Sequence, residues 1–479
     1  MQYRTDSCTH WDGKGEYKLG HKSRTGMARI GVILPSILLG LVIVVAIQIH
    51  VLRETYIELR EEMIRLHKHT NVRNVPGVPL TDYLDLESEN ADNYLDQYTT
   101  ALHNTDDDQM DEASQGTSID ADVPPHQNIV ILKTHKTASS TLQNILMRFG
   151  IERNLTFAIG KGVYRLGYPY HFRKNDTFPL NVDHINIFCH HARYSDDIKE
   201  IMPSDSKYIT ILREPLSLFP SLFFYYDIPS VLRMNVTGSV ALDTFTSNPT
   251  EWTRAIPVYG SSLRNPMLFD LGLPLASLGN LSDIRSYIQR IDTVYDLILI
   301  CEYFDESLIM MRDMLNWSTD DIVYIKQNAR SDDHSKPISS KTVEKLRKWN
   351  EGDEVLYDHF NRTFWNKAKK YGLAKLQHEV AKFRSRLREW ARSCVSDVPI
   401  RGIEMKDKDF RPYGPNTLVY PLLPEQNQNS TCRHLVKPEL KFTVEIVRSM
   451  YARGLFQLPS TRNESQQNEY VLLDALVNS

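Results

Sequence analysis

The longest apolar run of the chain extends from Ile30 to Leu52 and contains no Asp, Glu, Lys or Arg. A helix over this run is about 34 Å long, which is enough to cross a bilayer. A cleaved signal peptide has a shorter apolar core followed by a small-residue cleavage site, and this run has neither. The pattern therefore predicts an uncleaved transmembrane signal-anchor helix at residues 30–52, preceded by a cytosolic tail at residues 1–29.

Charges and glycosylation sequons indicate which side of the membrane the rest of the chain faces. Lys and Arg are concentrated before the anchor, whereas acidic and basic residues are mixed after it, which favours a cytosolic N-terminus. Sequons of the form N-x-S/T all follow the anchor, at Asn154, Asn175, Asn235, Asn280, Asn316, Asn361, Asn429 and Asn463. We therefore expect a single-pass type II protein with a lumenal domain, in the Golgi membrane or, as an alternative, in the plasma membrane.

The segment after the anchor changes from amphipathic to acidic. Up to about His69, apolar residues recur at helical spacing, a pattern that predicts a helix continuing out of the membrane and that is typical of self-association. A homodimer is therefore one expectation. The following residues are polar, with an acidic cluster at 106–112, up to two prolines at 124–125. Residues 53–125 are predicted to form a stem that is flexible in its second part.

From His126 onward, short runs rich in β-branched residues alternate with helical patterns. The runs predict strands at Ile129–Leu132, Ile185–Cys189, Tyr208–Leu212 and Leu297–Cys301. Helical periodicity follows at Ser307–Leu315, Lys341–Trp349 and Leu373–Ala391. This alternation predicts an α/β domain with a mainly parallel sheet at residues 126–393. Residues 394–479 are rich in Pro, Asn and Gln, and we treat them as a C-terminal extension without an assigned structure.

Composition and cysteine content exclude several kinds of protein. The formal net charge of −4 gives the chain no overall attraction to nucleic acid, so any anion site has to be local. The five cysteines lack the spacing of a zinc site. Cys394 and Cys432 flank a Pro-rich stretch and can form a disulfide in an oxidising compartment. Buried thiols are the alternative, which we prefer for Cys189 and Cys301.

The most informative segment has the order strand, loop and helix and extends from Ile129 to Phe149. The helix begins at the carboxyl end of the strand, where its free N–H groups and positive dipole attract an anion. The candidate anion-binding residues of this loop are Lys133, Lys136, Thr137, Ala138, Ser139, Ser140 and Thr141. A Walker A motif is absent, which disfavours a nucleoside triphosphatase. A Ser/Thr-capped helix beside two surface lysines is the alternative interpretation.

A second segment, Tyr208 to Ser221, repeats the order of strand, turn and helix. Arg213 stands at the end of the strand and can bind an anion through two hydrogen bonds, and Ser221 can add a hydroxyl group two helical turns later. Two anion sites at the ends of two parallel strands suit a nucleotide that carries phosphate at both its 5′ and its 3′ position.

This pair of segments resembles the 5′-phosphosulfate loop and the 3′-phosphate motif of sulfotransferases that use 3′-phosphoadenosine-5′-phosphosulfate (PAPS). The stretch Leu132–Leu142 is similar to the galactose-3-O-sulfotransferases, a family that includes galactosylceramide sulfotransferase. The resemblance covers roughly His126 to Gly372. Further stretches that agree are Cys189–Arg193, Glu302–Ser307, Asn328–Arg330 and Leu356–Trp365.

The resemblance implies a fold, a reaction and a set of site residues. The fold is a P-loop-like parallel sheet flanked by helices, and the reaction transfers a sulfuryl group from PAPS to the 3-hydroxyl of galactose on a galactosylceramide-like glycolipid or on a glycoprotein. In the resemblance, Arg213 and Ser221 take the 3′ role, and the 5′ role falls to Lys136, Thr137, Ala138, Ser139, Ser140 and Thr141. The implied catalytic residues are His135, Lys136 and His191, and no metal is required.

Sulfuryl transfer needs a base for the acceptor hydroxyl and positive charge on the leaving oxygens. Lys136 suits the charge role. His135 lies in the same loop, and the pair at 190–191 follows a second strand, so the identity of the base stays open. Arg193, like Lys133, binds donor or acceptor or else pairs with a carboxylate. Glu302 orients a sugar hydroxyl or caps a helix.

Two other classes of protein remain as alternatives. A metal-dependent Golgi glycosyltransferase would share the topology and use a DxD carboxylate pair. The DxD matches, at 106–108, 120–122 and 407–409, lie in the acidic stem or the extension rather than after a core strand. A non-enzymatic glycosylated ectodomain would more often be built from β-sandwiches. Within the family, the sequence leaves the choice between glycolipid and glycoprotein acceptors open.

Overall fold

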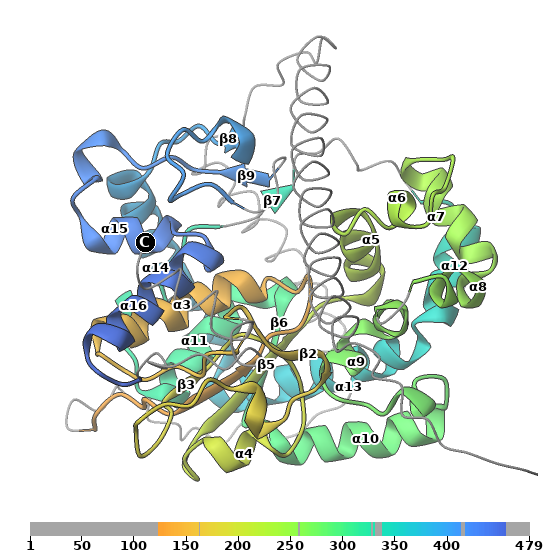
Figure 1. Cartoon of the computed structure of the whole chain (residues 1–479), viewed down its shortest axis with the longest axis horizontal. Coiled ribbons are helices and arrows are strands. Elements are labelled where there is room, and N and C mark those ends of the chain that lie inside the picture. Colours follow the sequence, from red (N-terminus) through yellow and green to blue (C-terminus); the bar gives the residue numbers. More distant parts are fainter. Residues whose placement is uncertain are drawn as a thin grey trace, which may run out of the picture. The chain divides into compact units, whose positions relative to one another are not determined.

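A four-stranded parallel sheet forms the centre of the fold (Figure 1). The computed structural model describes residues 123–456, with gaps at 162, 257–258, 327–328, 331–337 and 413–416. The strand order is β3 (Ile187–Phe188), β1 (Ile129–Leu132), β5 (Lys207–Leu212) and β6 (Leu297–Ile300). These are the four strands predicted from the sequence, so the predicted α/β fold with a parallel sheet is confirmed.

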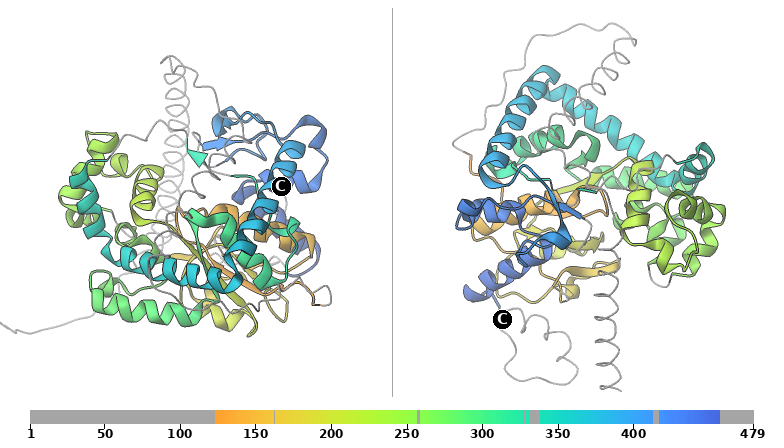
Figure 2. Two further views of the ribbon diagram at one scale, coloured as in Figure 1. Left: turned by 180° about the vertical axis from the view of Figure 1, so that it is seen from behind. Right: turned by 90° about the horizontal axis from the view of Figure 1, so that it is seen from above.

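Helices flank the sheet, and its strands are accordingly mostly apolar and buried, with Lys207 and Thr210 of β5 as polar positions. All four residues of β1 are fully buried. In the rear view of Figure 2, the long helix α13 lies across the sheet, and both α11 and α13 contact β6. The helices associated with this layer are α3 (Ser139–Glu152), α4 (Ile198–Ile201), α9 (Pro266–Asp270), α10 (Leu281–Val294), α11 (Phe304–Leu315), α13 (Glu351–Tyr371) and α14 (Leu373–Cys394).

A second, smaller hydrophobic core lies beside the sheet. Phe219, Phe223 and Phe245 are its buried aromatic residues. It is formed by helices that Figure 1 shows gathered on the right: α5 (Pro215–Tyr225), α6 (Ile228–Val231), α7 (Gly238–Ser247), α8 (Pro249–Arg254) and α12 (Ser340–Trp349). Because α5 directly follows β5, this core holds the helix that carries Ser221.

Two small sheets and several 3-10 helices lie outside the central sheet. Strands β2 (Arg165–His171) and β4 (His191–Arg193) pair in parallel, whereas β7 (Ala329–Arg330) and β8 (Ile400–Arg401) pair antiparallel with β9 (Thr417–Val419). The 3-10 helices are η1 (Lys174–Asp176), η2 (Gly260–Leu263), η3 (Leu275–Ser277), η4 (Cys301–Tyr303), η5 (Asp320–Ile322), η7 (Gly402–Glu404) and η8 (Pro424–Gln426).

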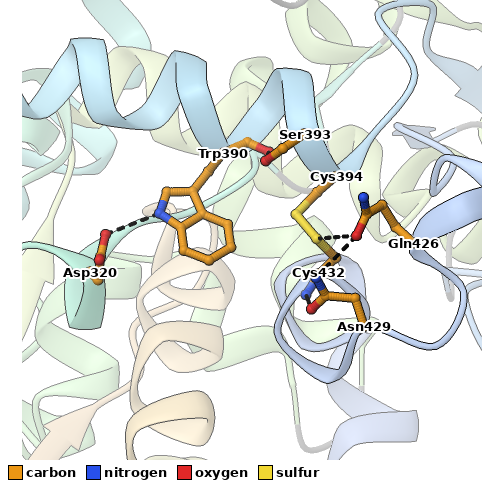
Figure 3. Close-up of a disulfide and its surroundings, with 7 residues drawn as sticks. All are labelled: Asp320, Trp390, Ser393, Cys394, Gln426, Asn429 and Cys432. Carbon is orange, nitrogen blue, oxygen red and sulfur yellow. Dashed lines mark hydrogen bonds between the residues drawn. A yellow bond between two sulfur atoms is a disulfide. The ribbon is translucent and has the colours of Figure 1, made fainter.

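The segment after Cys394, which had no structure assigned from its sequence pattern, packs on the α/β core. Helices α15 (Ser430–Val436) and α16 (Glu439–Ala452) contact α3, and Leu435, Phe442 and Val447 are fully buried there. A disulfide joins Cys394, at the end of α14, to Cys432 in α15 (Figure 3). Cys189 and Cys301 are free thiols, and Cys189 is buried. The α/β unit therefore extends well beyond residue 393.

The membrane anchor predicted at residues 30–52 and the stem up to residue 122 lie outside the described residues. Within the part of the chain that the structure describes, no helix combines the length and the apolar character needed to span a bilayer.

Candidate active site

The loop after β1 is held in an unusual backbone conformation at the start of α3. Lys136 and Ala138 both have a φ of 62°, in the left-handed region, where a small side chain such as that of Ala138 costs least. The Thr134 hydroxyl donates to the carbonyl of Ile211, and the Ser139 hydroxyl donates to the carbonyl of Thr134. These bonds fix the loop against β5 and fix the direction of its backbone N–H groups.

The predicted 5′-phosphate residues fall into two groups within this loop. The hydroxyl of Thr137 bonds inside the loop, to Thr134, as does that of Ser139. Because these hydroxyls are already used, Thr137 and Ser139 can bind an anion only through their backbone N–H groups, which have no intrahelical acceptor in the first turn. Thr141 is buried, and its N–H donates to Ala138. Ser140 is half-buried and lines a large cavity.

The loop after β5 contacts the loop after β1. Because β1 and β5 are neighbouring parallel strands, both loops lie at the same edge of the sheet. A guanidinium nitrogen of Arg213 (Nη1) donates to the carbonyl of Lys136 over 3.0 Å. The Lys136 ammonium group lies 3.7 Å from the centre of the Tyr225 ring, on the helix that follows Arg213. Ser221 is buried in that same helix, two turns from its start.

Glu302 supports the turn that carries Arg213. Its carboxylate accepts hydrogen bonds from the backbone N–H of Glu214 and from the Tyr357 hydroxyl, over 3.0 and 2.9 Å. Burial raises the pKa of Glu302, against the lowering effect of these hydrogen bonds and of Arg213. Two roles were considered for Glu302, contact with a sugar and capping of a helix. The observed contacts favour capping, because they stabilise the turn between β5 and α5.

A cavity of about 1080 Å³ opens beside these loops. Its volume is in the range of a site for a small ligand. Aromatic side chains form much of its wall, among them Tyr164, Tyr168, Tyr225, Tyr226 and Tyr259. Polar residues at the cavity surface include His135, Ser140, His191, Asp270, Arg165 and Glu439. The two predicted catalytic histidines therefore face the same cavity.

His135 lies at the centre of a cluster of polar rings. Its Nδ1 atom and its backbone N–H both contact one carboxylate oxygen of Asp270, each over 2.8 Å. The Tyr168 hydroxyl donates to the other oxygen of Asp270 over 3.1 Å. The ring of His191 stacks on that of His135, with centroids 4.3 Å apart. Asp270 is 1% exposed and lines the cavity, so its carboxylate is a fixed part of the cavity wall.

The two adjacent histidines after β3 have different surroundings. His190 is buried and its Nε2 atom contacts the Thr443 hydroxyl of α16 over 3.0 Å. Burial lowers the pKa of His190 to about 4. Since successive residues of an extended chain point in opposite directions, His191 faces the cavity instead. Burial, together with the positive charges of Lys133 and His135, lowers the pKa of His191 well below its usual value.

Lys133 and Arg193 both bind protein groups. The buried Lys133 ammonium group forms an ion pair with Glu439 of α16 and donates to Gln143 over 2.6 Å. Burial would raise the pKa of Glu439, but the charge and hydrogen bond of Lys133 outweigh it, and that pKa is lowered. The Arg193 guanidinium donates to the carbonyls of Phe269 and Leu273, on either side of Asp270.

Replacing Lys133 with methionine is expected to destabilise the fold by about 1–3 kcal/mol, because Glu439, whose side chain is 22% exposed, loses the buried ammonium group that pairs with it. A double variant, Lys133→Met with Glu439→Leu, is expected to recover most of this loss. Denaturant unfolding of the full chain measures both. The matched control is Lys199→Met, which removes an exposed ion pair with Asp196 and is expected to cost less than about 1 kcal/mol. A Lys133→Met variant as stable as the unmodified chain would show that the ion pair between Lys133 and Glu439 does not stabilise the fold.

Two functional candidates of this site were missed by sequence reasoning. Asp270 ends the short helix α9, between apolar residues, and no motif signals its role. Glu439 lies in the extension that had no assigned structure, yet it reaches the first residue of the β1 loop. Of the DxD matches, only 407–409 is described. There Asp407 and Asp409 are exposed, and the carboxylate of Asp407 accepts the backbone N–H of Asp409.

Comparisons with known proteins agree on one family. The family model described as galactose-3-O-sulfotransferase matches residues 93–450. Human galactosylceramide sulfotransferase is 31% identical over 344 residues, which are 70% of this chain and 81% of the relative. Pig galactose-3-O-sulfotransferase 2 is 33% identical over 347 residues, covering 69% and 86%. Mouse galactose-3-O-sulfotransferase 3 is 32% identical over 345 residues, covering 69% and 79%. The match is longer than the stretch from His126 to Gly372 and includes α15 and most of α16.

Proposed function

This chain belongs to the galactose-3-O-sulfotransferase family and is therefore a sulfotransferase, and we propose that it transfers a sulfuryl group from PAPS to the 3-hydroxyl of a galactose residue. The relatives are named for galactose and for galactosylceramide, so the proposed acceptors are a galactose-terminated glycolipid and a galactose-terminated glycoprotein glycan. Family membership disfavours the glycosyltransferase and the non-enzymatic ectodomain as alternatives.

The observation that carries the proposal is the contact between the two anion-binding loops. The hydrogen bond from Arg213 to the carbonyl of Lys136 brings the ends of β1 and β5 within reach of one small molecule. In this arrangement the N-terminus of α3 and Lys136 bind the 5′-phosphosulfate, and Arg213 with Ser221 binds the 3′-phosphate. A nucleotide with a single phosphate would use only one of the two loops.

The chemistry is assigned to the two histidines at the cavity wall and to Lys136 in the loop beside it. The galactose hydroxyl oxygen forms a bond to sulfur while the bond from sulfur to the 5′-phosphate oxygen breaks, and the electron pair of that bond stays on the phosphate. Lys136 stabilises the negative charge that develops there. The hydroxyl proton passes to a histidine at the cavity surface, His135 or His191. No step of this scheme needs a metal ion.

The proposed compartment is supported by the predicted anchor, the sequons and the disulfide. A type II protein of the Golgi membrane with a lumenal catalytic domain would expose Cys394 and Cys432 to an oxidising environment, where their disulfide persists. The proposed arrangement therefore comprises the tail at 1–29, the anchor at 30–52, the stem at 53–125 and the catalytic part after it. A homodimer formed through the helix after the anchor belongs to the same proposal.

The test is a transfer assay with the full chain in detergent, without added metal. PAPS labelled in its sulfate is incubated with galactosylceramide, lactosylceramide and N-acetyllactosamine, and the position of sulfate on the product is determined. We expect label at the 3-hydroxyl of galactose on at least one acceptor. Absence of label from every acceptor, while adenosine 3′,5′-bisphosphate still binds, would refute galactose as the acceptor, and absence of binding would refute PAPS as the donor.

A further inference from the structure

We propose that Asp270 is a positioning residue that makes His135, rather than His191, the base of the reaction. This inference rests on the proposed function, because it assigns a role within the same transfer step. The inference adds two points to the proposed function. It names Asp270 as the residue that fixes the imidazole of His135, and it gives the stacked rings of His135 and His191 different roles. Asp270 acts through His135, and it is His135 that contacts the acceptor hydroxyl.

The contact between Asp270 and His135 determines which ring nitrogen carries a hydrogen. An ionised carboxylate only accepts hydrogen bonds, so Nδ1 of His135, 2.8 Å from the Asp270 oxygen, is the donor. The lone pair of the neutral ring is then on Nε2, at the opposite side of the imidazole. A carboxylate that orients a histidine in this way also stabilises the imidazolium formed when the base takes a proton.

Asp270 is itself held on several sides. Its second oxygen accepts the hydroxyl of Tyr168. The start of helix α9 is capped by Asp353, whose two oxygens accept the N–H groups of Met267 and Leu268, each over 3.0 Å. Arg193 binds the carbonyl that precedes Asp270. A carboxylate fixed in this way holds the imidazole in one orientation, which is what proton transfer to a bound hydroxyl requires.

His191 lacks an equivalent anchor. Within the described residues, its Nδ1 atom is buried without a hydrogen-bond partner. It lies among positive groups, since Lys133, His135 and Arg165 all disfavour a charge on its ring. Its stacking contact with His135 is nearly parallel, with an angle of 19° between the rings. His191 therefore remains neutral and packs against the base, while the base receives the proton beside a negative carboxylate.

The ionisable and aromatic groups around His135 come from several elements. They are Asp270 of α9, Tyr168 of β2, His191 of β4, Tyr226 after α5 and Lys136 of the same loop. Among the described residues, Asp270 is the carboxylate that contacts the imidazole, so its removal is expected to leave the ring without the partner that fixes its orientation.

The experiment compares Asp270→Asn with His135→Ala and with the double variant, in the full chain. For Asp270→Asn we expect kcat to fall at least ~10-fold but less than for His135→Ala. In the His135→Ala background, Asp270→Asn is expected to have no further effect on kcat. The matched control is Asp292→Asn, which removes the carboxylate of an exposed His–Asp pair with His359 and is expected to leave kcat unchanged.

Two outcomes would overturn the inference. One is additivity of the two losses, and the other is hydrogen on Nε2 rather than on Nδ1 of His135. Nitrogen NMR of histidine-labelled unmodified protein gives an answer that does not depend on the folding of Asp270→Asn: the His135 signal, assigned by its loss in His135→Ala, is expected to show hydrogen on Nδ1. Hydrogen on Nε2 would refute the inference. Binding of adenosine 3′,5′-bisphosphate to each variant separates this failure from failure of the proposed function.

Discussion

Replacing His135 with alanine is expected to lower kcat by about 100- to 10,000-fold, the range typical of a lost general base. The affinity for the nucleotide is expected to change little, because the imidazole contacts Asp270 and faces the cavity rather than the Arg213 turn. Steady-state rates with saturating PAPS and a galactose acceptor measure the first effect. Calorimetric titration with adenosine 3′,5′-bisphosphate measures the second.

The matched control for this prediction is His359→Ala, a histidine paired with a carboxylate on the surface. It is expected to retain full activity. A His191→Ala variant provides the opposite test: because His191 packs against the His135 ring, some loss is expected through displacement of that ring. Near-normal kcat in His135→Ala together with a larger loss in His191→Ala would show that the roles are reversed.

Replacing Lys136 with alanine is expected to lower kcat by about 100- to 1,000-fold, a typical loss when a charged group no longer stabilises the developing negative charge. The ammonium group now lies over the Tyr225 ring at the edge of the site, and its backbone carbonyl, which holds Arg213, is unaffected by the substitution. The loss should therefore appear in kcat more than in the binding of the bisphosphate.

Single-turnover kinetics with PAPS separate these two effects for Lys136→Ala. The exposed Lys199, paired with Asp196, supplies the control, since Lys199→Ala is expected to behave as the unmodified chain. A Lys136→Ala variant that raises KM for PAPS and leaves kcat unchanged would show that the lysine binds donor and transition state equally, contrary to the role assigned to it.

The central sheet could be predicted from the sequence because each of its strands lies in a short run of mostly apolar, buried residues. Ile129–Leu132 and Leu297–Ile300 are apolar at every position, with boundaries within a residue of those predicted. The small strands β2 and β4 were not predicted. They are partly exposed and contain Tyr, Pro, His and Arg, so they show neither a continuous apolar run nor a regular alternation.

The candidate site was only partly accessible to sequence reasoning. Loop residues such as Lys136 and Arg213 follow strands directly, so their place at the sheet edge could be inferred. Asp270 is separated from His135 by 135 residues, and its role depends on the way α9 packs, which no local pattern encodes. Glu439 was missed for the same reason, because Pro-rich sequence precedes α16 and its partner Lys133 lies 306 residues away.

The most direct test of the account is whether one bisphosphorylated nucleotide bridges the β1 and β5 loops. Calorimetric titration of the full chain with adenosine 3′,5′-bisphosphate and with adenosine 5′-phosphate compares the two ligands. Ser221→Ala and Arg213→Ala are both expected to weaken binding of the bisphosphate, and Arg213→Ala is expected to do so by at least ~10-fold. Ser221→Ala is expected to leave the affinity for adenosine 5′-phosphate unchanged. Equal weakening of both ligands by Ser221→Ala, or no preference of the unmodified chain for the bisphosphate, would contradict the account.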